Sequence, residues 1–263
     1  MEMHTSCSAF KKNIAAHYAG DHTIHSDNRK ANELYQTSIM SALLEGVYEG
    51  EVTFGELKAH GDFGIGTFND LDGEMLAVDG NFYQLRSDGT ASLVNDDQLT
   101  PFAVVTFFKE QLVHQIEALI DKAGFQTLLD TLVPSANLFY AIRINGTFSK
   151  VDTRTVSIQK KPFISLTEVA NEQTTFHFES LEGTMAGFRS PDYAQGLTVA
   201  GYHLHFIDSN RSRGGHVLDF VLDKGTVMID TYSSIHVELP QTADFEQAKI
   251  AKDNSSDIKK AEG

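Results

Sequence analysis

The sequence predicts an α+β fold, in which helices and strands mix and two β-rich units are packed with helices. Short apolar or alternating segments fill residues 63–108, and a second, longer series fills residues 138–238. Helical periodicity separates the two series. We therefore expect four parts: a polar N-terminal arm over 1–30, an α/β unit over 31–150, a second β-rich unit over 151–240, and a C-terminal tail over 241–263.

The first unit opens with an apolar pattern of helical spacing. From Glu33 onward, Ile39, Leu43 and Val47 mark one side of a helix. Thr53 and Glu56 have the spacing of a capping box, which predicts the start of a short helix.

Strand-like segments follow this helix. The runs FGIGTF, EMLAVDG, NFYQLRSDG and TASLV are apolar or alternating, and the pairs Asp79-Gly80 and Asp88-Gly89 mark turns. FAVVTFF over 102–108 has the composition of a buried strand, and EQLVHQIEALIDK with FQTLLDTLV returns to helical spacing.

The second unit contains mostly strands. LFYAIRI and KVDTRTVSI precede a short helix predicted for SLTEVANEQ. Strands are then expected in TTFHFESL, EGTMAGF, GLTVAGYHLHFI, GHVLDFVL and TVMIDTYSSIHVEL, and a helix in TADFEQAKI.

Charge and cysteine content limit the classes of function. The net charge of −15, from 21 basic and 36 acidic side chains, repels phosphate backbones, so we expect no nucleic-acid partner. Cys7 is the only cysteine, which excludes an intrachain disulfide and a thiolate-based metal site. No apolar run approaches the roughly 18 residues of a membrane span, and none resembles a signal peptide. A cytoplasmic protein without a membrane partner is expected.

Three histidines have the spacing of metal ligands. His203 and His205 are two residues apart in an alternating run, so a strand directs both side chains to the same face. The turn-rich residues 208–215 predict a hairpin loop that brings His216 back beside them. Three imidazoles without cysteine suit zinc with open coordination positions, which is typical of a catalytic site.

Other interpretations of these residues remain open at this point. A pair of histidines on a strand is also found on half-buried polar faces that bind no metal. The isolated histidines at 60, 114, 177 and 236 are expected to be surface or core residues. Glu74 lies in a strand-like segment, and this position alone only weakly indicates a role in a site.

Much of the chain resembles the alpha-acetolactate decarboxylase family. The resemblance is carried by residues 35–89, which include GDFGIGTFNDLDGE, and by TPFAVVTFF, FYAIRINGTF, TRTV and GYHLHFIDSNRSRGGHVLDFVL. It extends over nearly the whole chain apart from the first 30 residues. The motifs GDFGIGTFNDLDGE and GYHLHFI are specific to the family.

The resemblance implies a set of site residues. It places the zinc ligands on His203, His205 and His216, and other site residues on Glu74, Thr67, Arg154 and Glu262. Because these residues come from both units, the resemblance implies two β-rich units that share one metal site. It also implies that the C-terminal tail, which contributes Glu262, folds back over that site. A homodimer is the assembly we expect.

The resemblance also implies a reaction, the decarboxylation of 2-acetolactate to acetoin and carbon dioxide. Zinc would act as a Lewis acid on the chelated hydroxy-ketone and stabilise the enediolate that remains. Arg154 would hold the carboxylate through two hydrogen bonds, and Glu74 and Glu262 would manage stereoselective protonation.

Two other classes of protein are alternatives. A cupin-like metal oxygenase also places two histidines on one strand, but its third histidine follows further β-structure, whereas His216 comes 11 residues after His205. A non-enzymatic β-sandwich binding protein would need no open metal site. Oxygen consumption and acetoin formation distinguish these classes.

Overall fold

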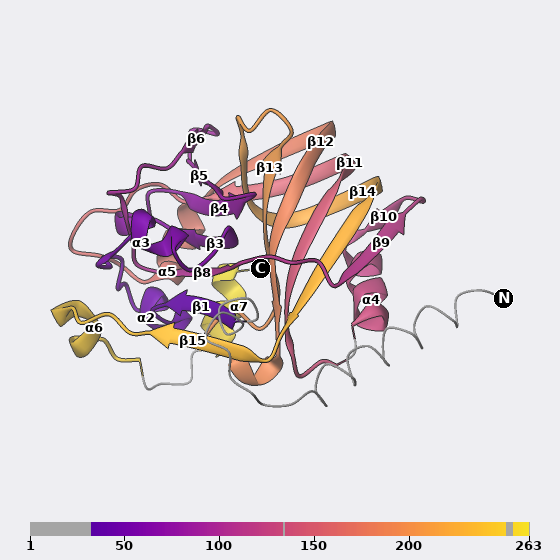
Figure 1. Ribbon diagram of the computed structural model, residues 1–263. Helices are drawn as coiled ribbons and strands as arrows, with labels where there is room; N and C mark the ends of the chain where they lie inside the picture. The colour runs from indigo at the N-terminus through magenta and orange to yellow at the C-terminus, as the bar shows by residue number, and fades with distance from the viewer. Residues whose placement is uncertain (1–32, 134, 251–254, 263) are drawn as a thin grey trace, which may run out of the picture.

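The computed structural model describes residues 33–133, 135–250 and 255–262, and it contains two large β-sheets that lie side by side (Figure 1). The first sheet has seven strands. Their order is β15 (Ser234–Glu238), β1 (Glu33–Thr37), β8 (Ala103–Thr106), β3 (Phe63–Thr67), β4 (Glu74–Val78), β5 (Asn81–Leu85) and β6 (Ala91–Leu93). A separate two-stranded ladder joins β2 (Val52–Thr53) to β7 (Leu99–Thr100).

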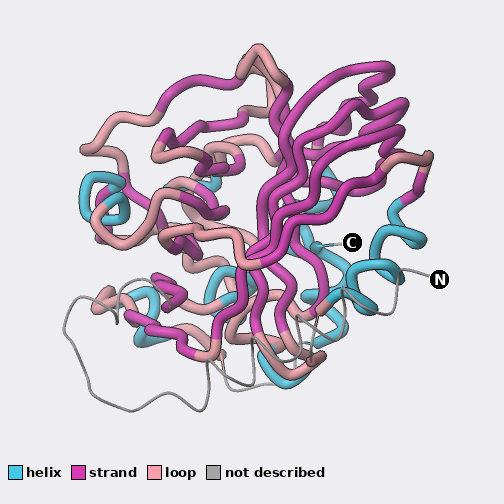
Figure 2. The backbone as a smooth tube through the Cα atoms, turned by 45° about the vertical axis from the view of Figure 1, so that its right-hand side comes forward, coloured by secondary structure: helices cyan, strands magenta, loops and turns pink. Residues whose placement is uncertain are grey.

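The second sheet has six strands and is dominated by long antiparallel ones, which Figure 2 shows bending together. The order is β10 (Ile120–Asp121), β14 (Gly214–Tyr232), β11 (Phe139–Thr155), β12 (Thr174–Ser190) and β13 (Gly201–Asp208), and β9 (Leu112–Ile116) also pairs with β14. The first residues of β14 pair with β13 as well, so β11, β12, β13 and β14 close on one another at that end.

Short helices surround the sheets. They are α2 (Met40–Leu44), α3 (Phe54–Lys58), α4 (Lys122–Leu132), α5 (Leu166–Val169), α6 (Ala243–Gln247) and α7 (Ser255–Glu262), with 3-10 turns at Asn69–Leu71, Ala170–Glu172 and Asp192–Ala194. Among the described residues, no helix is long and apolar enough to cross a membrane.

The largest apolar core joins the two sheets. It combines Ile65 and Leu76 of the first sheet with Ala141 and Phe188 of the second, and Ile258 of α7 is buried in the same cluster. A second core, rich in phenylalanine, fills the space enclosed by the long strands and α4. Because the shared core holds the sheets against each other, side chains on their facing strands have fixed relative positions.

Most predicted elements are confirmed, including the mixed α+β class. The capping box at Thr53 and Glu56 is present with both of its hydrogen bonds. The turn at Asp79-Gly80 joins β4 to β5, and both residues have positive φ, as a tight hairpin requires. The strand predicted over 102–108 is β8, and the helices predicted in FQTLLDTLV, SLTEVANEQ and TADFEQAKI are α4, α5 and α6.

Two predicted helices are wrong. Residues 33–37 form strand β1, which pairs with β8 and, in parallel, with β15; only Met40–Leu44 is helical. Residues 112–116 form strand β9 rather than the start of a long helix. Both runs are short. Strand β1 is buried on both faces, so its residues lack the alternation typical of a strand and can be taken for one side of a helix.

The sheets do not follow the order of the chain. β15 comes late in the sequence but belongs to the first sheet, whereas β9, β10 and α4 precede β11 and pack with the second. Position 150, the expected division between the units, lies inside β11. The expected N-terminal arm over 1–30 lies outside the described residues.

Candidate metal centre

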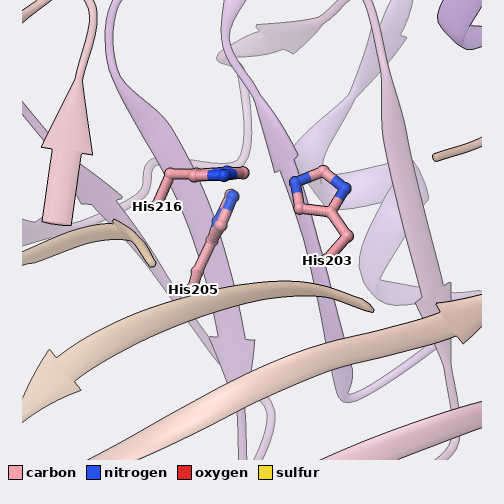
Figure 3. Close-up of side chains that lie close together, drawn as sticks. All are labelled: His203, His205 and His216. Atoms are coloured by element: carbon pink, nitrogen blue, oxygen red, sulfur yellow. The ribbon is translucent and has the colours of Figure 1, made fainter. Parts of the chain in front are cut away.

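Three histidines converge where β13 meets β14. β13 directs His203 and His205 to one face, and His216 lies directly opposite His205 in the β13–β14 ladder. One ligand nitrogen from each ring lies within 4.8 Å of the others, and Figure 3 shows the three rings turned toward a common point. The alternation of the strand and the hairpin predicted from the sequence therefore bring these side chains together.

The ring of His205 is oriented by a backbone group from the first sheet. Its Nδ1 lies 2.7 Å from the carbonyl oxygen of Met75 on β4. A carbonyl only accepts, so Nδ1 donates and the lone pair is on Nε2. Nε2 is buried and has no hydrogen-bond partner among the described residues. A buried imidazole nitrogen with a free lone pair, pointing at two other imidazoles, fits a metal ligand.

Burial keeps His203 and His205 in the neutral form that binds metal. The side chains of His205 and His216 are almost fully buried, and His203 is only slightly more accessible. Burial, and then the nearby Arg154 guanidinium, lowers the pKa of His203 to about 3. Burial, followed by the neighbouring His203, holds the pKa of His205 well below its usual range. At neutral pH these two rings therefore need not lose a proton to bind a cation.

Glu74 and Arg154 complete the polar surroundings of the histidines. Glu74 Oε2 lies 3.6 Å from His205 Nε2, and Glu74 Oε1 lies 3.7 Å from Arg154 Nη1. Glu74 and Arg154 are 8% and 3% exposed, so their charges are poorly screened by solvent. A carboxylate and a guanidinium thus lie beside the three imidazoles.

The backbone explains how these groups meet. Arg154 pairs with His216 across the β11–β14 ladder, and a Cβ on Gly215 would lie only 2.7 Å from the Arg154 carbonyl oxygen. Glycine at 215 therefore allows β14 to approach β11 beside the site. Strand β4, which carries Glu74, lies against β13. Glu74 of the first sheet therefore lies beside the histidines of the second.

Comparison with known proteins shows which family this fold and site belong to. The family model described as alpha-acetolactate decarboxylase matches residues 34–252. The alpha-acetolactate decarboxylase of Bacillus subtilis strain 168 is 46% identical over 237 residues, which cover 90% of this chain and 93% of that protein. The protein of the same name from Methylococcus capsulatus is 47% identical over 238 residues, 90% of this chain and 92% of its own length.

A solved structure agrees with the sequence matches. The crystal structure of the Bacillus subtilis strain 168 alpha-acetolactate decarboxylase superposes with a TM-score of 0.87 at 47% identity. The superposition covers 88% of this chain and 99% of the Bacillus subtilis chain. The chain belongs to the alpha-acetolactate decarboxylase family. The resemblance noted in the sequence is thereby confirmed, and the oxygenase and binding-protein alternatives are set aside.

The threonine that the family resemblance singles out has a structural partner. Thr67 is buried, lies opposite Glu74 in the β3–β4 ladder, and its Oγ1 donates to the carbonyl oxygen of Gly73 at 2.7 Å. In this structure the hydroxyl therefore holds the turn that leads into Glu74.

The predicted tail residue Glu262 has a described backbone but no described side chain. It is the last residue of α7, a helix that packs against α2 and α5 and buries Ile258 and Ala261. The Glu262 side chain is outside the described part of the structure, so the role that the family resemblance implies for its carboxyl group stays a prediction.

The isolated histidines lie elsewhere. His60 and His236 both stack on Tyr35, at 3.8 and 5.6 Å between ring centroids, and His177 Nδ1 contacts an oxygen of Asp152. Within the described part of the chain, only His203, His205 and His216 are grouped as metal ligands require.

Two contributions to the site were not predicted from the sequence. The first is the Met75 carbonyl that orients His205, because a main-chain acceptor has no residue-type signal. The second is Asp208, which binds the loop between the ligand strands. Asp208 is the first residue of the turn-rich run 208–215, and an aspartate in that place often accepts backbone hydrogen bonds of its own loop.

Proposed function

We propose that this chain decarboxylates 2-acetolactate to acetoin and carbon dioxide at the site formed by His203, His205 and His216. The observation that carries the proposal is the buried, unpartnered His205 Nε2, which points at two further imidazoles beside a buried carboxylate and guanidinium. Membership of the alpha-acetolactate decarboxylase family supplies the substrate.

We assign zinc to the three histidines. Three neutral nitrogen donors without a thiolate suit zinc and leave coordination positions open for substrate. When bound, zinc supplies a Lewis acid that polarises the hydroxy-ketone oxygens of the substrate. Met75 holds the His205 ring in the matching orientation through its carbonyl oxygen.

Arg154 is assigned to the substrate carboxylate. In a protein with a net charge of −15, an anionic substrate needs a local positive group, and Arg154 is a buried guanidinium at the site. Its planar group can donate two parallel hydrogen bonds to a carboxylate. Such a contact orients the carbon–carbon bond that breaks as carbon dioxide leaves.

Glu74 is assigned to proton management. When carbon dioxide leaves, the electron pair of the broken bond stays on the remaining fragment, which must gain a proton to become acetoin. Glu74 lies on one side of the histidines, so its carboxyl group, once it has taken up a proton, can deliver that proton to a single face and favour one enantiomer. We assign Thr67 to holding the turn before Glu74, and Glu262 to a second carboxyl group of the site.

The proposal also concerns how the two units, the C-terminal tail and the assembly are arranged. We infer that the two β-rich units share the metal site and that the C-terminal tail, through α7, folds back over it. The burial of Ile258 in the core between the sheets supports this placement of the tail. A cytoplasmic homodimer is the state we propose for the enzyme, and sedimentation of the purified protein tests the dimer.

The proposed reaction is tested with purified protein and racemic acetolactate. We expect carbon dioxide release and acetoin formation above the spontaneous rate, together with about one zinc per chain by elemental analysis. His205→Ala removes a ligand and is expected to lose both zinc and turnover, whereas Glu179→Gln, an exposed change on β12, retains both. If metal-loaded wild-type protein forms no acetoin above the spontaneous rate, the proposed function is wrong.

A further inference from the structure

The two strands that carry the three histidines are joined to each other by a short ladder. We call residues 203–216 the ligand hairpin. On their outer sides, β13 pairs with β12 along its whole length, and β14 pairs with β11 from His216 onward. The direct link between His205 and His216 is therefore this short ladder and the loop that closes it. Its pairs are His205 with His216, Phe206 with Gly215, and Ile207 with Gly214.

Asp208 closes the ladder from inside the loop. Its side chain is buried, and Oδ1 accepts from the Ser212 backbone N–H at 2.8 Å. Oδ2 accepts from Ser212 Oγ and from Arg213 Nε, both at 3.1 Å. The Asp208 backbone N–H also donates to the Arg213 carbonyl, and its own carbonyl accepts from Arg211 N–H. The Asp208 side chain thus binds the returning end of the loop at Ser212 and Arg213, and its backbone binds Arg211 and Arg213.

The same loop is joined to both sheets. The Ser212 carbonyl accepts from the N–H of Ala91 on β6, at 2.8 Å, which links the loop to the first sheet. Ser209 N–H donates to the Glu182 carbonyl on β12, and the Arg213 guanidinium lies 5.1 Å from the Phe178 ring centroid. A change in the loop would therefore alter contacts at the ends of both ligand strands.

We propose that Asp208 is a positioning residue of the metal centre, whose carboxylate sets the separation of His205 and His216 and thereby the affinity for the metal. The inference rests on the proposed function, because it assumes that the histidines bind zinc. Asp208 lies three residues beyond His205, about 10 Å along the strand, so it acts through the hairpin and not as a ligand. Groups that orient metal ligands typically change metal affinity by about 10–100-fold when removed.

The test measures zinc affinity by competition with a chromogenic chelator, using the full-length apoprotein. We expect Asp208→Ala to weaken zinc binding by about 10–100-fold. Asp208→Asn keeps an oxygen for the Ser212 N–H and should lose less than about tenfold. The matched control is Asp219→Ala, which removes a half-exposed aspartate of β14 that pairs with Lys150 at 3.1 Å; it lies three residues beyond His216, as Asp208 lies three residues beyond His205, but outside the loop. The control should bind zinc as the wild type does.

Hydrogen exchange of the apoproteins separates positioning from general stability. Asp208→Ala should accelerate amide exchange in residues 203–216 while α4 stays protected as in the wild type. If Asp208→Ala does not fold, Asp208→Asn and the double variant Ser212→Ala/Arg213→Gln, which removes two of the side-chain contacts, take its place.

Each outcome decides the inference. Zinc affinity of a folded Asp208→Ala variant that equals wild type, or equal losses in Asp208→Ala and Asp219→Ala, would overturn the positioning role alone. Failure of the wild-type protein to bind zinc would overturn the proposed metal site together with this inference. Graded losses, largest in Asp208→Ala and absent in the control, support it.

Discussion

At the scale of single residues, the site depends on how a few buried polar groups are satisfied. His205 has one nitrogen bound to the Met75 carbonyl and one left for a ligand. Glu74 lies between that ligand nitrogen and Arg154, at 3.6 and 3.7 Å. Such groups are costly to bury unless they are paired, so their presence at one point indicates a functional centre.

Glu74→Gln tests the proton role at this scale. The amide has the shape of the carboxyl group but cannot act as an acid or base near neutral pH, so we expect kcat to fall by about 10²–10⁴-fold. Zinc content should stay close to one per chain, since Glu74 is not among the three proposed ligands. Steady-state kinetics and chiral chromatography of the acetoin check the prediction. Wild-type kcat with unchanged enantiomeric purity would remove Glu74 from the mechanism.

At the scale of elements, one buried carboxylate secures the crossover between the sheets. Residues 107–111 connect β8 of the first sheet to β9 of the second. Asp230 on β14 is fully buried and accepts from Lys109 N–H at 2.9 Å, from its neighbour Thr231 N–H, and from the Tyr232 hydroxyl at 2.6 Å. These bonds tie the crossover to the centre of the second sheet.

Asp230→Asn tests this anchor through its pH dependence. Burial raises the pKa of Asp230 above its usual range, despite the hydrogen bonds donated to it. Below the unfolded pKa, near 3.9, both states are protonated; as pH rises toward the raised pKa, the unfolded state loses its proton first. Wild-type stability should therefore fall relative to the variant, by at most about 1.4 kcal/mol per pH unit.

The measurement is urea unfolding of both proteins at several pH values from 4 to 7. A constant difference in unfolding free energy between the two proteins reflects the altered hydrogen bonds and does not bear on the pKa. If the difference in unfolding free energy between the two proteins does not change with pH, the raised pKa of the buried Asp230 carboxyl group is wrong.

At the scale of the whole molecule, polar groups of the two sheets meet beside the three histidines. The ligand hairpin belongs to the second sheet, while Glu74 and the Met75 carbonyl come from the first. The sheets are also linked by Arg143 on β11 and Asp79 in the β4–β5 turn, an ion pair with distances of 2.6 and 3.0 Å. A bound metal would thus stabilise the pairing of the sheets as well as the hairpin.

Metal removal tests this coupling. A ligand at about 100 times its Kd stabilises the folded state by about 2.7 kcal/mol, which corresponds to a Tm change of roughly 5–10 °C for a chain of this size. We expect dialysis against a chelator to lower Tm by that order and added zinc to restore it, as measured by calorimetry. His205→Ala should show no zinc-dependent shift. Equal Tm values with and without metal would argue against a metal that stabilises the fold.

The sequence by itself determined the local features of this protein. The capping box at Thr53, the turn at Asp79-Gly80 and the hairpin with its three histidines depend on residues close in the chain, and all are found in the structure. The family motifs also indicated Glu74 and Arg154, which the fold brings together beside the histidines. Strand alternation and turn chemistry act over a few residues, so they are legible in sequence.

Only the tertiary structure decided which distant segments meet. The helix predicted from Glu33 onward is wrong at strand β1, because the partners of this strand lie far away in the chain: Glu33 pairs with Ser234. The contact of the Met75 carbonyl with His205 joins two sheets and has no residue-type signature. Such pairings are selected by burial of a shared core, a property of the whole chain that no local pattern records.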